Sequence, residues 1–204
     1  MHHTASYRPH TNPFARLFGP KPETKAQNLT DPGMIEIMGG VITSSGIQVS
    51  AQTAMRVPAV ACAVALISET VGTLPVKLHD RDTKATASDH PAYALIHDEA
   101  NPWTSAEALR NALTLDALLT DNGYAQVVRL ADGTPFELHR LDPQTVKQEL
   151  NADGEPVYIV QTPDGPRTFP YTDILHITPF AGVSPIKLAR EAIALTLAFE
   201  GHVA

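Results

Sequence analysis

Cysteine is nearly absent from this chain of 204 residues, because Cys62 is the only one. A single cysteine excludes an intramolecular disulfide, and the apolar neighbours from Val60 to Val64 predict a small buried side chain, not a nucleophile. Long apolar runs are also missing, since the longest, Val57 to Ile67, has about half the length that a bilayer-spanning helix needs. The first ten residues show no secretory signal. The composition therefore predicts a soluble protein that is kept in a reducing environment and has no membrane partner.

Basic residues are scarce in most of the chain. Residues 51–204 carry 11 Lys and Arg against 19 Asp and Glu, whereas residues 1–50 carry four basic and three acidic residues. Arg110 and Arg129 could each contact a phosphate, but neither has basic neighbours. Tight binding of nucleic acid needs clustered Lys and Arg that displace counterions from the phosphates. The acidic body therefore argues against such binding, although it is compatible with a surface past which DNA slides.

Motifs of catalysis and of metal binding are missing as well. The sequence has no phosphate-binding loop, no nucleophile elbow and no zinc-binding helix with paired histidines. We interpret His2, His3 and His10 as residues of a tail and not as metal ligands, and His176 as a half-buried strand histidine and not as a general base. The acids that are close in sequence fall in predicted loops or at helix ends. These absences together predict that the protein is not an enzyme and holds neither a metal ion nor a cofactor.

The 17 prolines predict many turns and extended segments, beginning at the N-terminus. Residues 1–33 contain five of them and little hydrophobic periodicity, which is typical of a mobile arm. Residues 34–49 predict a weak hairpin or loop around Gly39-Gly40. We therefore expect residues 1–49 to form a partly disordered N-terminal arm.

Helical periodicity begins near Ser50. Residues 50–55 predict a short helix, and Pro58 is placed to begin a second one. The apolar residues of the second helix recur at spacings of three and four, which predicts a largely buried amphipathic helix: Val60, Val64, Ile67 and Val71. Gly72 ends it, and Leu74 to Leu78 predict a strand, followed by a charged loop.

Two further helices are predicted before residue 123. His90-Pro91 opens the first, and Thr104 with Glu107 predicts a capping box at the start of the second. This helix should run to about Asp121, with Gly123 as its stop signal. Trp103 lies directly before it, and we interpret it as a packing anchor, with an interface contact as the alternative.

The pattern then changes to alternating strands. Four segments separated by turn residues predict one antiparallel meander: Tyr124–Leu130, Phe136–Leu141, Thr145–Leu150 and Val157–Gln161. Asp173 to Ile177 is a short helical turn or strand, and Ser184-Pro185 caps a long helix that still continues at Ala204, so we expect the sequence or its ordered part to be truncated there. The order of elements indicates an α+β fold, with buried helices packed on the meander.

Eight phrases occur in a particular order and spacing: Val57–Glu69, Leu74–Leu78, His90–His97, Asn101–Thr104, Gly123–Ala125, Leu141–Pro143, Asp173–Ile177 and Gly182–Arg190. Their order resembles that of the phage portal protein family, of the long-tailed phage type that includes gene-transfer-agent portals. The resemblance covers the N-terminal half of such a protein, and residues 1–49 match nothing in it.

The resemblance implies a structural protein that forms a closed ring of about twelve subunits at one capsid vertex. Such a ring is the conduit for DNA packaging and ejection and the head–tail connection of a virion or phage-like particle, which is assembled in the cytoplasm of the bacterial host. The partners that it implies are terminase, the major capsid protein, head-completion adaptor proteins and double-stranded DNA that passes non-specifically. The alternative is a protein-binding adaptor module of a larger assembly, with residues 124–162 as its recognition sheet.

In this interpretation residues 50–184 are a wing-like domain, and residues 185–204 begin the helix that leads to the stem. The clip and the crown of the family would follow Ala204. Residues that could contact a neighbouring subunit or the capsid are the basic residues of the arm, one aromatic residue and two residues of the last helix: Arg8, Arg16, Lys21, Lys25, Trp103, Pro185 and Arg190.

Overall fold

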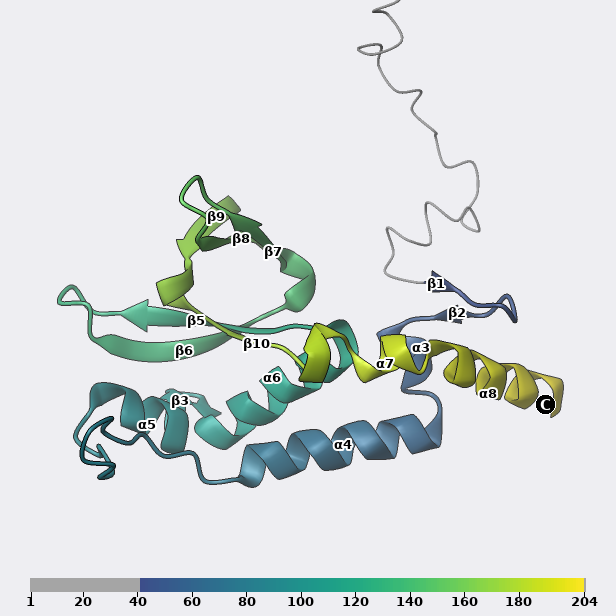
Figure 1. The fold of residues 1–204 in the computed structure, drawn as a ribbon, viewed down its shortest axis with the longest axis horizontal. Helices are drawn as coiled ribbons and strands as arrows, with labels where there is room; N and C mark the ends of the chain where they lie inside the picture. Colours follow the sequence, from purple (N-terminus) through teal and green to yellow (C-terminus); the bar gives the residue numbers. More distant parts are fainter. Residues whose placement is uncertain (1–40, 204) are drawn as a thin grey trace, which may run out of the picture.

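Two long helices run side by side along the molecule, for which the computed structural model describes residues 41–203 (Figure 1). Helix α4 (Pro58–Thr73) begins at the predicted proline, and helix α6 (Ala106–Thr120) packs along it. The buried residues of α4 lie four apart: Val64, Ser68 and Gly72. A Cβ atom at Gly72 would lie 3.0 Å from that of Asn111, so the small side chains let the two helices approach closely.

The other side of α4 is exposed, so the prediction of a largely buried helix is wrong for this side. Ile67 is 45% exposed, Leu66 is 68% exposed, and Val71 also lies at the surface. Cys62, which was predicted to be buried, is exposed one helical turn before Leu66. Because α4 packs mainly on α6, a narrow stripe of small residues covers its inner side, and the larger apolar residues remain outside.

A short hairpin and a one-turn helix precede α4. A hairpin is present in residues 41–49, but it is not the one expected around Gly39-Gly40. Its turn contains Gly46, which has a φ of 77°, whereas Gly39-Gly40 lies outside the described residues. The elements are β1 (Val41–Ile42), β2 (Gln48–Val49) and α3 (Ala51–Ala54).

The chain between α4 and α6 is mostly irregular. The strand predicted for Leu74 to Leu78 does not form in the described structure; only the single bridge between His79 and Thr86 is present next to it. No neighbouring segment offers this stretch a ladder, because the short strands that follow pair with each other. These elements are α5 (Pro91–His97), which begins after His90 as predicted, β3 (Glu99–Asn101) and β4 (Thr104–Ser105).

Helix α6 is capped one residue later than the sequence predicted. The Ser105 hydroxyl accepts the Ala108 N–H at 3.1 Å, and the predicted capping box of Thr104 and Glu107 is wrong because Thr104 is held in β4. At its other end the helix stops at Asp121, which adopts the left-handed conformation with a φ of 77°. The predicted stop residue, Gly123, belongs to the strand that follows.

Six strands form two antiparallel sheets of three strands, so the prediction of a single meander is wrong. The four predicted strands exist, but a 3-10 turn after Asp142 directs the chain away from the first sheet into the second (Figure 1). A later strand then completes each sheet. The first sheet has the order β10 (Ile174–Ile177), β5 (Gly123–Arg129), β6 (Pro135–Leu141), and the second β7 (Val146–Leu150), β8 (Pro156–Thr162), β9 (Gly165–Pro170).

Side chains that alternate between the two faces of β5 show that the first sheet lies between the helices on one face and the second sheet on the other. Ala125 is fully buried in a cluster with residues of α5, α6 and β6, among them Leu113 and Leu138. The preceding residue, Tyr124, belongs to a different cluster with Tyr158 of β8. Successive side chains of a strand point to opposite faces, so one strand serves both clusters. The helices thus cover one face of an antiparallel sheet, and the predicted α+β class is confirmed.

The predicted last helix is divided into two. Ser184 caps it and Pro185 begins it as predicted, but α7 (Pro185–Leu188) ends at Ala189 and α8 (Arg190–Val203) continues from there. The two pieces have different supports: α7 is bonded to the end of α6, whereas α8 packs near β2. A third core cluster joins β2, α3 and these helices: Val49, Ala54, Val57, Ile186, Ile193 and Ala194. It includes residues from all three predicted segments of the chain, whose division remains a prediction.

We expect Gly123→Ala to destabilise the fold by about 2 kcal/mol or more, as overpacking of a tight contact does. A Cβ atom there would overlap the Leu113 carbonyl oxygen and lie 3.0 Å from the Ile177 side chain, so β5 would have to move off α6. Urea unfolding followed by circular dichroism measures this loss. Gly201→Ala is the matched control, since Gly201 lies in α8 with open space around it and alanine favours a helix. Equal stability of both variants would contradict the close contact.

Candidate functional site

Within residues 41–203 no group of three or more His, Cys, Asp and Glu residues is placed to hold a metal ion. In the same part of the chain no helix is long and apolar enough to cross a bilayer. The polar contacts of the described residues lie mainly where one element is fixed to another.

Both arginines that could have met a phosphate are engaged within the protein. The Arg110 guanidinium donates to the carbonyl oxygens of Ile96 and Gly72, each at 2.6 Å, and so connects α6 to α5 and to the end of α4. Arg129 donates to the Asp173 carboxylate at 3.1 Å and to the Thr172 carbonyl at 2.8 Å. These bonds make both residues structural connections between segments that are distant in the sequence.

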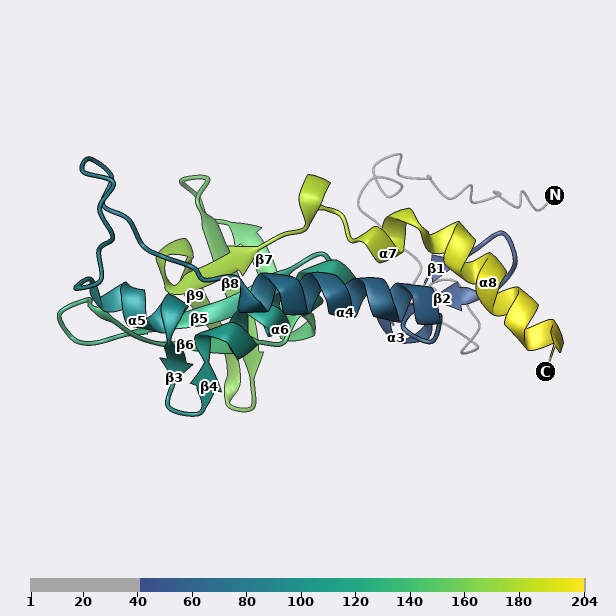
Figure 2. The ribbon, with the colours of Figure 1, turned by 90° about the horizontal axis from the view of Figure 1, so that it is seen from below.

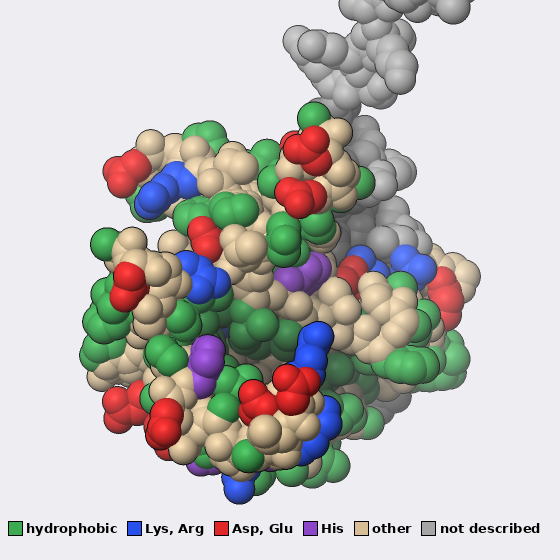
Figure 3. All heavy atoms as spheres, turned by 60° about the vertical axis from the view of Figure 1, so that its left-hand side comes forward, with side chains coloured by type: hydrophobic (Ala, Val, Ile, Leu, Met, Phe, Trp, Pro, Cys, Tyr) green, Lys and Arg blue, Asp and Glu red, His purple; other side chains and the backbone are tan. Residues whose placement is uncertain are grey.

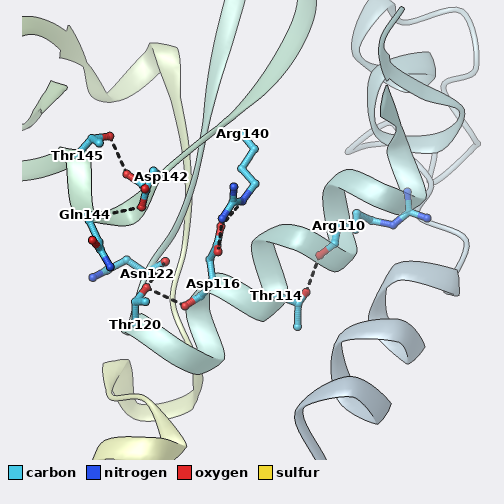
Figure 4. A network of polar contacts seen from close by, with 9 residues as sticks. All are labelled: Arg110, Thr114, Asp116, Thr120, Asn122, Arg140, Asp142, Gln144 and Thr145. Carbon is cyan, nitrogen blue, oxygen red and sulfur yellow. Dashed lines mark hydrogen bonds and ion pairs between the residues drawn. The ribbon is translucent and has the colours of Figure 1, made fainter. Parts of the chain in front are cut away.

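An ion pair fastens the first sheet to α6. Arg140 of β6 donates through Nε and Nη2 to the two carboxylate oxygens of Asp116, at 2.6 and 2.7 Å (Figure 4). The Asp116 side chain is 9% exposed and that of Arg140 is 45% exposed. The hydrogen bonds with Asp116 raise the pKa of Arg140. This two-pronged geometry fixes the direction of β6 across the helix as well as its distance.

A second junction ties the last helices to the end of α6. The Asp121 carboxylate accepts the backbone N–H of Ser184 and forms an ion pair with Lys187. The hydroxyl of Ser184, a fully buried residue, donates to the Leu118 carbonyl at 2.7 Å and accepts the Ile186 N–H at 3.0 Å. The direction of α7 is thus set by the C-terminal end of α6.

His176 of β10 is the half-buried strand histidine that the sequence predicted. Its ring stacks on Tyr124 with centroids 4.5 Å apart, and its two nitrogens lie 3.2 Å from the Tyr158 hydroxyl and 2.8 Å from the Asn122 side-chain oxygen. Burial lowers the pKa of His176, so the ring is neutral at pH 7. Its contacts join the two sheets and leave it a structural role.

The predicted contact residues are found in two separate places. Pro185 is exposed at the start of α7, and Arg190 is half-buried at the start of α8, where both belong to the junction region. Trp103 forms the turn between β3 and β4 and is 75% exposed, so its interpretation as a packing anchor is wrong. The basic candidates lie outside the described residues: Arg8, Arg16, Lys21 and Lys25.

Sequence reasoning missed the most exposed large hydrophobic residue of the described chain. Phe180 is 97% exposed and lies in the 3-10 turn η3 (Phe180–Gly182) between β10 and α7. The signal was present, because a single aromatic residue between Pro179 and Gly182 is placed in a turn and cannot reach a core. The exposed side of α4 was missed too, since periodicity does not tell which apolar stripe is covered.

The charged residues on the face drawn in Figure 3 do not form a basic patch. On the face drawn in Figure 3, Asp and Glu side chains lie at several separate places, and Lys and Arg side chains are scattered among them. Four of the basic residues are paired with acids: Arg129, Arg140, Lys147 and Lys187. The surface thus keeps the acidic balance of the sequence.

Comparison with known proteins identifies the family. Residues 58–204 match the phage portal protein family. The chain is 26% identical over 202 aligned residues to the probable portal protein of Streptomyces phage phiC31, an alignment that covers 88% of the chain and 42% of that protein. The chain therefore belongs to the phage portal protein family.

Solved structures agree with this assignment. A chain in the neck of an empty gene-transfer-agent particle, computed with C6 symmetry, superposes with a TM-score of 0.64 and 25% identity, covering 86% of this chain and 51% of that one. A chain in the neck of the native particle, computed with C12 symmetry, has a TM-score of 0.58 and 23% identity, covering 86% and 50%. This chain thus spans about half the length of the relatives it matches.

We expect Arg140→Ala to cost more stability than Asp116→Ala. Arg140→Ala leaves a buried carboxylate without its cation, so we expect the free energy of unfolding to fall by about 2–3 kcal/mol. Asp116→Ala leaves a half-exposed arginine that stays hydrated, so we expect a loss of about 1 kcal/mol. Urea unfolding at pH 7 measures both values. Equal losses in the two variants would contradict this asymmetry.

Proposed function

We propose that this protein is a structural subunit of a ring at the capsid vertex of a phage or gene-transfer-agent particle. The observation that carries the proposal is the superposition on a chain of a gene-transfer-agent neck over 86% of this chain. Two relatives come from necks that were computed with C6 and C12 symmetry, which supports a closed homo-oligomeric ring. The acidic surface and the engagement of Arg110 and Arg129 within the fold are compatible with a structural role without catalysis.

We propose further that the ring serves as a conduit for double-stranded DNA during packaging and ejection and as the head–tail connection. A conduit must let DNA slide, and each tight phosphate contact would be a barrier to translocation. The balance of 11 basic against 19 acidic residues in residues 51–204 supports this role, because like charges keep the duplex from adhering to the wall. Terminase, the major capsid protein and head-completion adaptor proteins are the proposed protein partners, in a particle assembled in the bacterial cytoplasm.

We propose a separate role for each of three segments of the chain, with the boundary between the last two at the junction that follows α6. Residues 50–184 would form the wing-like domain, and residues 185–204 would lead towards the stem, in a direction set by Asp121 and Ser184. Pro185 and Arg190 would contact a neighbouring subunit near this junction. Residues 1–49 would act as an arm whose Arg8, Arg16, Lys21 and Lys25 contact a neighbouring subunit or the capsid.

We expect the full-length protein to assemble into closed rings of one stoichiometry. Native mass spectrometry gives the number of subunits, and negative-stain images show the ring directly. A protein that stays monomeric over a wide concentration range would contradict the proposed function. Stable monomers that bind a peptide or protein partner would instead favour an adaptor module.

We expect the ring to bind a short DNA duplex weakly, at or beyond the weak end of about 10⁻⁴–10⁻⁶ M that is typical of non-specific binding at physiological salt. Fluorescence anisotropy at low and physiological salt measures this affinity. A chain without residues 1–33 is the control, because it lacks the four basic residues of the arm. Sub-micromolar binding that survives both physiological salt and this deletion would contradict a passive conduit.

A further inference from the structure

Two aromatic side chains are far more exposed than their size warrants. Phe180 is 97% exposed and Trp103 is 75% exposed, the two highest values among the large hydrophobic residues of the described chain. Exposed side chains of this size expose apolar area that a partner can bury, and tryptophan is among the residues that contribute most to interfaces. Neither residue takes part in the three core clusters, so the described fold does not depend on them.

Trp103 is held in place by a buried asparagine. Asn101 is 6% exposed, and its side-chain amide donates to the Leu138 carbonyl at 2.8 Å. Its side-chain oxygen accepts the backbone N–H of Trp103 at 3.2 Å. The indole ring also lies beside His139, with centroids 5.6 Å apart. The turn is therefore fixed to β6, and little conformational entropy would be lost when a partner covers the ring.

Phe180 is also presented by a constrained turn. Pro179 precedes it, Ala181 and Gly182 both have positive φ, at 64° and 68°, and the Gly182 N–H donates to the Pro179 carbonyl at 2.9 Å. A left-handed alanine costs about 1–2 kcal/mol, so the rest of the structure must hold this turn in place. Two residues later the chain is anchored by the fully buried Ser184.

The two turns lie on opposite sides of the molecule. In Figure 2 the β3–β4 turn lies at the lower margin and η3, the yellow-green turn before α7, lies at the upper margin, with α4 and α6 between them. In a ring that closes by rotation each subunit presents two different surfaces, one to each neighbour, and two turns on opposite sides of the molecule meet this requirement.

We infer that the surface around Phe180 in one subunit packs against the surface around Trp103 in the next. The inference rests on the proposed ring, and it names a second copy of this chain as the partner of both surfaces. Val183, which is also exposed, extends the apolar surface on the Phe180 side. On the Trp103 side, the His139 ring lies beside the indole ring, with centroids 5.6 Å apart. Helix α4 lies between the two margins in Figure 2, and its exposed residues Leu66 and Ile67 are left to other contacts.

Site-specific cross-linking tests the pairing directly. In a Cys62→Ser background, which removes the only cysteine, the exposed neighbours of the two aromatic residues are replaced, so that both rings stay in place. Pro102→Cys and Val183→Cys subunits are prepared and assembled together, and a short bifunctional maleimide is added. We expect covalent dimers in the mixed rings and none in rings of either variant alone. The double variant Pro102→Cys/Val183→Cys should give a ladder of covalent oligomers. Links between two subunits of the same single variant, or mixed rings without links, would overturn the inference.

Alanine substitutions give an independent readout. We expect Trp103→Ala and Phe180→Ala each to raise the concentration at which half of the protein is in rings by about tenfold or more, the effect of losing one interface hot spot. Their unfolding by urea should match wild type. Leu150→Ala is the matched control, since Leu150 is 68% exposed on β7 and belongs to neither surface, and it should leave ring formation unchanged.

The outcomes separate the inference from the proposed function. Wild-type protein that forms no rings contradicts the proposed function itself. If the wild type forms rings and Trp103→Ala and Phe180→Ala form them at the same concentration, only the inference is overturned and the proposed function is not. Rings that are lost in Leu66→Ala, on the exposed side of α4, while both aromatic variants assemble normally would place the subunit contact on α4 and would also overturn it.

Discussion

The structure depends on how closely strand β5 lies on helix α6. Gly123 has no side chain, and this lets the start of β5 pass directly over the Leu113 carbonyl. With β5 in this place, its partner β6 brings Arg140 over Asp116, and the helix end at Asp121 is free to receive Ser184. One close contact between a strand and a helix thus positions both the sheet and the exit of the chain towards α7.

Several large apolar residues of the described chain lie on its surface and not in its core. α4 packs against α6 through small side chains, and its larger residues, such as Leu66, face outward. Trp103 and Phe180 are exposed in turns that other bonds hold rigid. Ordered, exposed aromatic residues do not stabilise a monomer. In a subunit that binds neighbours on two sides they favour binding, because side chains that are already ordered lose less conformational entropy when a partner covers them. This fits a family whose relatives are found in particle necks of high symmetry.

Local signals in the sequence were reliable where a single residue type controls the backbone. Pro58 and Pro185 begin helices, His90 precedes one, and Ser184 caps one, as predicted. Signals that need a partner were less reliable. Leu74 to Leu78 has the residues of a strand but no strand beside it, and Thr104 was drawn out of its predicted cap by pairing with β3. The strands of the predicted meander are present, but the turn after Asp142 distributes them between two sheets, and local alternation does not specify which strands pair.

The sequence by itself determined the α+β class, the main helix starts, the acidic balance of the body and, through the order of short phrases, the portal family. These properties follow from composition and from neighbours along the chain. Only the tertiary structure decided that Cys62 and Leu66 are outside, that Trp103 is exposed, and that Arg110 and Arg129 connect elements within the protein. The exposure of a side chain and its partners depend on which segments meet in space. Small residues such as Gly72 and Gly123 let helices and strands pack closely against segments that are distant in the sequence, and a local pattern does not show which segments these are.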